Sequence, residues 1–553
     1  MSDSSTTKPP PFKRTAFAVA NDKGESVAEW SLTPTAISDM VQIVAQPIYT
    51  VPIIFVPGIM GSNLKLTEDV GIAKKGKPVW LLNGTLSALG KWPVRNPAER
   101  QILLNPATTE VHAGGAVPDF IPTIGDANQI RSLRYWGEVG AMSYQSYLVW
   151  LEKTLNQRRR HDEWQALVGQ PAFATALSKG YTFQTLEDKD LGHAVDMRFP
   201  VYACGYNWLQ SNSESAKRLA TRIDEVIAAN NSKSFTCDQV ILITHSMGGL
   251  VARACSELLG KRSKIAGIVH GVMPATGAAV AYKRVRTGTE GAAGIVIGDD
   301  AAKVTAVFAN SPGALQLLPS QHYGTGWLQL GMGTGNNFKV SCSLPIADPY
   351  SEIYEQRGKW WGLVREELIN PAELEGHLGW DSYLDNIHAA KKFHTNLGHQ
   401  YHAHTIAFYG DGSDDTNGKT WGKVRWECTG VNDMSTVTRG HTGHAQVNQT
   451  LDAPALLALP SSRDEGKGAL YCRHGNRYRY DFTLSGKDSV GDGTVPAVSG
   501  AAPATAGQSQ GVQASYHLSL DAEGHEGAYR IPLAQQLSVH AVLSIAKKIK
   551  VKI

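Results

Sequence analysis

The chain has 553 residues, of which 42% are hydrophobic and 19% are charged, and its formal net charge is +3. These values are typical of a soluble globular protein with one large core and insertions, or with two to three domains. The small net charge argues against a nucleic-acid-binding surface. No run of about 18 uninterrupted apolar residues is present, so we expect no membrane-spanning helix.

The first residues are polar and rich in proline, and they contain no apolar segment. We therefore predict that residues 1–14 are a disordered lead-in, and that the protein is made in the cytoplasm without a Sec signal peptide. The six cysteines are scattered and form no C-x-x-C pair, which fits folding in a reducing compartment.

Residues 15–65 are expected to hold an N-terminal hairpin and the first core strands. Alternating segments at 15–20 and 27–32 flank a turn, as in a hairpin. The apolar run 53–56 ends at Pro57-Gly58, which is typical of a buried parallel strand. Residues 66–195 follow as an insertion, the first part of a cap, with one amphipathic helix and clustered aromatic residues.

Residues 196–280 alternate between strands and helices. Buried strands are expected near 201–204, 240–245 and 265–272, with a helix at 213–229 that Ser213 would cap. This order predicts right-handed βαβ units and a parallel sheet. Ligands of such sheets bind beyond the carboxyl ends of the strands.

A second insertion at 281–400 would complete the cap, and the core would resume at 401–553. The predicted fold is therefore α/β, a mostly parallel central sheet flanked by helices with large cap or lid insertions. Features expected after residue 400 are strands at 404–410 and 514–520, a hairpin-rich excursion at 423–427 and 478–484, and a closing helix at 538–549.

Ser246 stands where an apolar strand breaks off and a helical segment begins at once. This is the layout of a nucleophile elbow, which holds a serine hydroxyl out toward a substrate. The usual pattern is G-x-S-x-G, and Thr244 replaces its first glycine. The alternative interpretation is an ordinary strand–turn–helix junction that happens to carry a serine.

A serine nucleophile needs a base within hydrogen-bond reach, and the base needs an acid to orient it. His525, in a glycine-flanked turn after the last predicted strand, is the expected base. Asp492, in the tight Gly-Asp-Gly-Thr-Val-Pro loop, is the expected acid, and the chain order Ser, acid, His is the usual one for this fold. Asp411 is the alternative acid. Of the other histidines, His517 would lie within a strand.

The oxyanion formed during acyl transfer needs backbone donors. The N–H of Met247, directly after the nucleophile, is expected to be one donor. The other should come from the loop after the first core strand, where Gly58 allows close approach, and Ile59 is the predicted residue. The alternative is that Pro57-Gly58 is only a strand-ending turn. His245, next to the serine, is expected to face away from the reacting centre.

Five blocks occur in one order and carry a family resemblance: residues 56–64, 206–208, 244–249, 311–319 and 491–496. Together they resemble the lecithin:cholesterol acyltransferase-like and GPI inositol-deacylase-like lipases of the α/β-hydrolase superfamily. The resemblance implies Ser246 as nucleophile, Asp492 as acid, His525 as base and Ile59 as an oxyanion donor.

Residues 272–278, 281–284 and the tract at 401–410 also resemble bacterial lipase effectors delivered by type VI secretion. That resemblance implies attack on phospholipids of rival cells, release by a route other than Sec, and an immunity or secretion-apparatus protein as partner. Trp136, Trp150 and Trp360-Trp361 would then be lid segments that touch a membrane surface. The competing interpretation places these side chains in the core of the cap.

The sequence thus predicts a serine-dependent esterase that hydrolyses acyl esters of phospholipids or similar lipids through an acyl-Ser246 intermediate. No metal or organic cofactor is implied, because the sequence contains no H-E-x-x-H, paired-cysteine or Walker A pattern. Two alternatives stay open. One is a lipid acyltransferase with an alcohol acceptor, and the other is a non-catalytic lipid- or protein-binding protein on a hydrolase scaffold.

Overall fold

A computed structural model of the chain describes most of the 553 residues. The described residues are 13–17, 19–20, 26–27, 40–44, 49–84, 92–157, 160–169, 185–232, 235–289, 296–376, 378–410, 419–437, 444–446, 450–506, 514–518 and 524–550.

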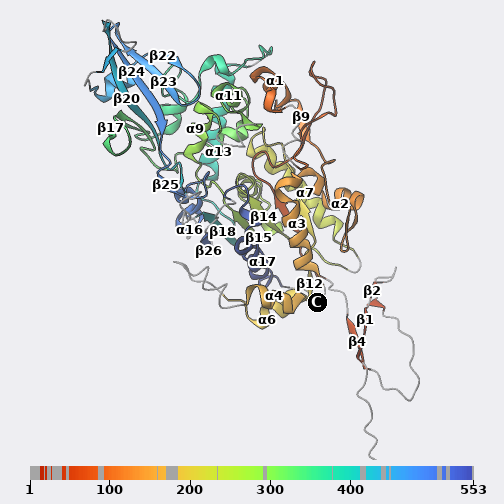
Figure 1. Ribbon diagram of the computed structural model, residues 1–553. Coiled ribbons are helices and arrows are strands. Elements are labelled where there is room, and N and C mark those ends of the chain that lie inside the picture. The colour runs from red at the N-terminus through yellow and green to blue at the C-terminus, as the bar shows by residue number, and fades with distance from the viewer. Residues whose placement is uncertain are drawn as a thin grey trace, which may run out of the picture.

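A six-stranded sheet, in which all neighbouring strands run parallel, lies at the centre of the molecule (Figure 1). In spatial order its strands are β13 (Val201–Ala203), β6 (Ile53–Val56), β14 (Val240–His245), β15 (Ile265–Gly271), β18 (Thr405–Gly410) and β26 (Ala514–Leu518). The mixed α/β class predicted from the sequence is confirmed.

Helices cover both faces of this sheet, and this explains why β6, β14 and β15 read as continuous apolar runs. Every residue of these three strands is buried. On one face, Ile53 and Phe55 pack in a core with helices α3 (Ala141–Asn156) and α17 (Pro532–Ala546). On the other face, Ile54 and Val56 pack in a core with α7 (Asn212–Ala229) and α8 (Gly248–Arg253).

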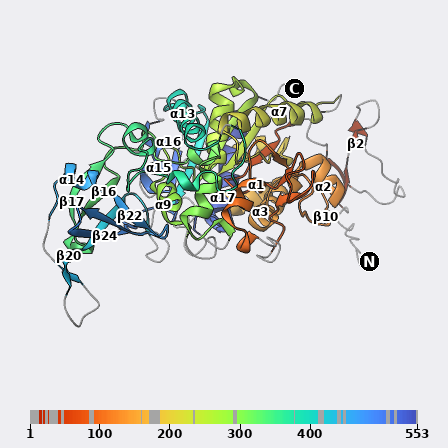
Figure 2. The ribbon, with the colours of Figure 1, turned by 90° about the horizontal axis from the view of Figure 1, so that it is seen from above.

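A second sheet of seven strands lies at one end of the molecule (Figures 1 and 2). Its path is β17 (Lys339–Leu344), β16 (Leu328–Met332), β20 (Val424–Val437), β24 (Tyr478–Ser485), β23 (Ala469–His474) and β22 (Ser461–Asp464), with β21 (His444–Gln446) paired to β20. The hairpin-rich excursion expected after residue 420 is therefore part of a sheet that also recruits strands from the segment 281–400.

The tryptophans considered as membrane-facing lid residues are mostly buried. Trp136, Trp360 and Trp361 are 2%, 2% and 5% exposed. Trp360 stacks on Phe482 of the second sheet with ring centroids 4.5 Å apart, and its indole N–H donates to a backbone carbonyl. Trp150 is partly buried against the central core. These residues stabilise the packing of the fold, as the competing interpretation expected.

Several boundaries differ from the sequence prediction. Helix α7 begins at Asn212 because Ser211, and not Ser213, caps it by accepting the Glu214 N–H. The closing helix α17 begins at Pro532, six positions before the predicted start, since proline is favoured in the first helical turn. In the described part of the predicted N-terminal hairpin, β2 (Val19–Ala20) pairs antiparallel with β3 (Ser26–Val27), whereas β1 (Lys13–Phe17) pairs in parallel with β4 (Met40–Val44).

Further elements surround the two sheets. The helices include α1 (Pro97–Leu103), α2 (Ala127–Arg134), α4 (Arg160–Val168), α6 (Asp188–Val195), α9 (Ala279–Thr287), α11 (Ala301–Phe308), α12 (Pro312–Leu315), α13 (Trp380–Leu397), α14 (Ala453–Ala458), α15 (Ala497–Gly500) and α16 (Ala502–Ala506). The short strands include β5 (Tyr49–Thr50), β7 (Leu64–Leu66), β8 (Pro78–Trp80), β9 (Thr109–Val111), β10 (Phe120–Ile121), β11 (Gly125–Asp126), β12 (Met197–Arg198), β19 (Lys419–Thr420) and β25 (Ser489–Val490).

Candidate active site

Ser246 lies at a sharp turn between strand β14 and helix α8. Its φ is 51°, a left-handed value that residues other than glycine rarely adopt, so the backbone is strained at this point. A Cβ at Gly248 would lie 2.4 Å from the Pro57 carbonyl oxygen, so only glycine lets the helix pass this close to the end of β6. The turn has the geometry expected of a nucleophile elbow.

The structure brings the three predicted catalytic side chains together. Nε2 of His525 lies 2.8 Å from Oγ of Ser246, and Nδ1 of His525 lies 2.8 Å from Oδ2 of Asp492. An ionised carboxylate only accepts hydrogen bonds, so Nδ1 carries the imidazole proton and Nε2 accepts from the serine hydroxyl. This arrangement suits transfer of the serine proton to the imidazole.

The loop that carries Asp492 fixes both the acid and the base. Oδ1 of Asp492 accepts the backbone N–H groups of Thr494 at 2.9 Å and of Val495 at 2.6 Å. The backbone carbonyl of Asp492 accepts the N–H of His525 at 3.0 Å. The Asp492 side chain is 1% exposed, whereas that of His525 is 13% exposed. Three hydrogen bonds, from Thr494, Val495 and His525, therefore fix the Asp492 carboxylate, whereas the imidazole of His525 is accessible to a substrate.

The two predicted oxyanion donors flank the serine. Ile59 follows Gly58, whose added Cβ would lie 3.0 Å from the Cβ of Ser246, so the loop after β6 approaches the nucleophile closely. Met247 opens helix α8. In the ranges that the structure describes, neither the Ile59 N–H nor the Met247 N–H has an acceptor. Both donors are therefore available to a developing negative charge.

The loop after β6 is held by side chains from distant segments. The Tyr206 hydroxyl donates to the Pro57 carbonyl at 2.9 Å, and the Trp80 indole N–H donates to the Met60 carbonyl at 2.7 Å. Met60 has a φ of 62°, a second strained position in this loop. These contacts fix the carbonyls on both sides of Gly58 and Ile59. The Gly58 carbonyl, which shares a peptide plane with the Ile59 N–H, accepts the Gly61 N–H at 3.0 Å, and this bond orients the Ile59 donor.

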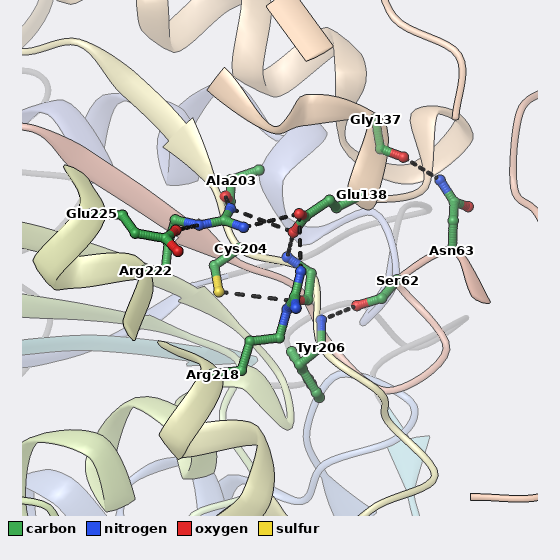
Figure 3. A network of polar contacts seen from close by, with 11 residues as sticks. Ser62, Asn63, Gly137, Glu138, Ala203, Cys204, Tyr206, Arg218, Arg222 and Glu225 are labelled. Carbon is green, nitrogen blue, oxygen red and sulfur yellow. Dashed lines mark hydrogen bonds and ion pairs between the residues drawn. The ribbon is translucent and has the colours of Figure 1, made fainter. Parts of the chain in front are cut away.

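A buried ion-pair network extends this support (Figure 3). Oε1 of Glu138 lies 2.9 Å from Nη2 of Arg222 and 3.0 Å from Nη2 of Arg218, both on helix α7. The neighbouring residue, Gly137, accepts from the Asn63 side chain at 3.0 Å. The network ties the end of the loop after β6 to the helix that covers the sheet.

Two residues that contact the site have no role in the sequence prediction. His245 was expected to face away from the reacting centre, but its ring hydrogen-bonds to the backbone of His525. Tyr144 lies within the segment 66–195, where the sequence indicates clustered aromatic residues and no particular role, and its hydroxyl contacts His245. Asp411, the alternative acid, lies outside the described residues. His517 lies on β26, in register with Tyr409.

The described residues offer neither a metal site nor a membrane-spanning helix. They contain no group of three or more His, Cys, Asp or Glu side chains arranged to hold a metal ion. Among them there is also no helix with the length and apolarity needed to cross a bilayer.

Comparison with known proteins shows similarity to solved structures. No family model matches the chain, and no curated protein matches it. Among solved structures, a chain from "The crystal structure of Tle4-Tli4 complex" superposes with a TM-score of 0.71 and is 30% identical in sequence. The match covers 91% of the present chain and 99% of the other chain, so the similarity extends over nearly the whole length of both.

Proposed function

Because the chain belongs to the family of Tle4, a type VI lipase effector, we propose that it is a serine-dependent esterase that hydrolyses the acyl esters of phospholipids. The observation that carries this proposal is the hydrogen-bonded series Ser246, His525 and Asp492, with both links at 2.8 Å. The proposed fold is that of an α/β-hydrolase with a cap formed by the segments 66–195 and 281–400.

In the first half of the proposed reaction, Oγ of Ser246 attacks the ester carbonyl carbon while Nε2 of His525 takes the hydroxyl proton. The carbonyl oxygen becomes an oxyanion that accepts the N–H groups of Ile59 and Met247. Asp492 stabilises the imidazolium and keeps its tautomer. Collapse of the tetrahedral intermediate breaks the ester C–O bond, and His525 protonates the departing alkoxide.

In the second half, water enters the site and attacks the carbonyl carbon of acyl-Ser246. His525 takes a proton from the water, and the same two N–H groups hold the new oxyanion. Cleavage of the bond to Oγ releases the fatty acid, and the proton on His525 returns to the serine. An alcohol in place of water would give acyl transfer, so product analysis with added alcohol separates hydrolase from transferase.

The same match supports a proposal about a partner protein. The matched chain was solved as a Tle4–Tli4 complex, which supports an immunity protein as a partner of the present chain. We also propose synthesis in the cytoplasm, export by a route other than Sec, and transient contact with a membrane surface during lipolysis.

The test is mass spectrometry of lipid products from mixed phospholipid vesicles, with the wild type compared with Ser246→Ala. The wild type should release free fatty acid and lysophospholipid, and Ser246→Ala should release neither while its thermal unfolding stays nearly unchanged. A fluorophosphonate should label the wild type at Ser246 only. Full activity of Ser246→Ala, or the absence of labelling, would remove the proposal.

A further inference from the structure

Three hydrogen bonds join the loop after β6 to the loop that carries His525. The Gly58 N–H donates to the Tyr144 hydroxyl oxygen at 3.1 Å. The same hydroxyl lies 3.0 Å from Nδ1 of His245, and Nε2 of His245 lies 2.9 Å from the backbone carbonyl oxygen of His525. The series runs from the segment that bears the proposed oxyanion donor to the segment that bears the proposed base, directly beside Ser246.

The chemistry of the groups determines which one donates and which one accepts in each bond. A carbonyl only accepts, so Nε2 of His245 carries a proton and donates it to His525. Nδ1 of a neutral imidazole is then an acceptor, so the Tyr144 hydroxyl donates to it. The Tyr144 oxygen in turn accepts the Gly58 N–H. The Tyr144 hydroxyl and the His245 imidazole thus each donate one hydrogen bond and accept one, and every donor in the series has an acceptor.

The surroundings maintain these roles. Tyr144 and His245 are each 1% exposed. Burial, together with the nearby His525, lowers the pKa of His245 to about 4, so its imidazole is neutral near pH 7. Burial also raises the pKa of Tyr144 well above its usual value, so its hydroxyl keeps its proton. The hydrogen-bond series is therefore intact across the neutral pH range.

The series also packs tightly against the loop after β6. A Cβ at Gly58 would lie 2.8 Å from Nδ1 of His245, and a Cβ at Gly61 would lie 2.7 Å from the Tyr144 hydroxyl. Both glycines thus let the loop rest on the two side chains. Since the Gly58 N–H is used by Tyr144, the next N–H along the chain, that of Ile59, is the one left for the oxyanion.

We propose that Tyr144 and His245 are positioning residues that hold the oxyanion donor at Ile59 and the imidazole of His525 in fixed geometry relative to Ser246. Neither residue exchanges a proton with the substrate. The inference rests on the proposed function, because it concerns the same site. It extends that function by assigning a role to a helix residue that lies 101 positions before His245 in the chain.

Tyr144→Phe tests the bridging hydroxyl. This variant removes two hydrogen bonds while it keeps the ring, so the two loops lose their common anchor. A displacement of about 1 Å at a reacting centre can cost on the order of 100-fold in rate. With a soluble ester such as p-nitrophenyl butyrate, we expect kcat to fall by roughly 10- to 100-fold while KM changes less than about threefold.

Tyr147→Phe is the matched control. Tyr147 lies on the same helix α3 and is fully buried, and in the described part of the chain its hydroxyl has no hydrogen bond to Gly58, His245 or His525. Its variant should keep the wild-type kcat. Equal losses of kcat in Tyr144→Phe and Tyr147→Phe would overturn the inference, because the effect would then be general packing.

His245→Gln provides a second, independent test. Glutamine places an N–H donor near the position of Nε2, toward the His525 carbonyl, but it has no acceptor atom at the position of Nδ1, which Tyr144 contacts. His245→Gln therefore removes the Tyr144–His245 hydrogen bond, which is one of the two bonds lost in Tyr144→Phe. The double variant Tyr144→Phe/His245→Gln should be no slower than Tyr144→Phe alone. Additive losses in kcat would show that the two residues act separately, and the inference would fail.

Ser246→Ala separates this inference from the proposed function. If Ser246→Ala is inactive while Tyr144→Phe and Tyr147→Phe behave alike, the serine mechanism stands and only the positioning role is lost. If Ser246→Ala retains full activity, both fail together.

Discussion

The hydroxyl oxygen of Thr244 lies 2.9 Å from Nδ1 of His270, its direct neighbour across strands β14 and β15. Both residues are fully buried, and the Thr244 carbonyl accepts the Tyr529 hydroxyl at 2.8 Å. Thr244 occupies the position that is glycine in the common nucleophile motif. The larger side chain fits because the adjacent strand supplies a polar partner for it, so the departure from glycine leaves the turn at Ser246 intact.

Thr244→Val should destabilise the protein by about 1–3 kcal/mol, because valine keeps the shape of threonine but leaves Nδ1 of His270 unsatisfied. In the described part of the chain, Nε2 of His270 has no partner either. Urea denaturation measures the effect. The double variant Thr244→Val/His270→Leu should lose less than the sum of the two single variants, and strictly additive losses would contradict the pairing.

The three residues proposed for catalysis could be predicted from the sequence because each lies in a short segment whose turn chemistry is local. Ser246 follows an apolar strand, and Asp492 and His525 lie in glycine-flanked loops. Tyr144 could not be predicted in the same way. An aromatic residue on a helix indicates only burial, and the contact of its hydroxyl with His245 depends on how α3 packs against the sheet.

In the fold too, elements with a local sequence pattern could be predicted, and contacts between distant segments could not. Strands β6, β14 and β15 could be predicted because burial on both faces makes them continuous apolar runs. The second sheet could not be assembled from the sequence, because β16 pairs with β20 across nearly a hundred intervening residues. No short stretch of sequence indicates which strands pair over such a separation.

The wrong start predicted for helix α7 has a simpler cause. Two serines, Ser211 and Ser213, lie close to the helix start, and both are good capping residues.

Gly58→Ala should lower kcat by about 100-fold, because the added Cβ would lie 2.8 Å from Nδ1 of His245 and 3.0 Å from the Cβ of Ser246. The loop would have to shift, and the Ile59 N–H would move with it. Kinetics with a soluble ester measure the loss. Gly84→Ala is the control, since a Cβ there meets nothing within 4 Å. Comparable activity in the two variants would contradict close approach at Gly58.

Buried neutral histidines predict a pH-dependent stability. Burial lowers the pKa of His394 from 6.5 to about 4. Below pH 6.5 the unfolded chain binds a proton that the folded protein excludes, so the free energy of unfolding falls as the pH is lowered from 6.5 to 4. At pH 5 this histidine alone should cost about 2 kcal/mol relative to pH 7.

His394→Gln checks this prediction, because glutamine can still donate to the Gln316 carbonyl that accepts from Nε2 of His394 at 2.8 Å. The stability loss between pH 7 and pH 5, measured by urea denaturation, should be smaller in this variant than in the wild type. His388→Gln, at an exposed position on the same helix, is the control and should keep the wild-type dependence. An unchanged dependence in His394→Gln would show that this residue is not the cause.

Glu138→Gln should destabilise the protein by about 3–5 kcal/mol, because it removes the buried carboxylate that pairs with Arg222, whose side chain is 6% exposed, and with Arg218, whose side chain is 40% exposed. The Glu138 side chain is 5% exposed, and it also accepts the Gly205 N–H at 3.0 Å. Glutamine keeps the size of the side chain, so the loss reports on charge and not on a cavity. Urea denaturation gives the free energy of unfolding.

Glu225→Gln is the matched control, because Glu225 contacts the same Arg222 at 3.0 Å but its side chain is 49% exposed. Solvent screens that pair, so its loss should cost no more than about 1 kcal/mol. Since the Glu138 network anchors the loop that carries Ile59, Glu138→Gln should also lower kcat in the folded fraction, whereas Glu225→Gln should not. If the two variants lose the same stability and the same kcat, the buried ion pair of Glu138 supports the site no more than the exposed pair of Glu225 does, and the prediction is wrong.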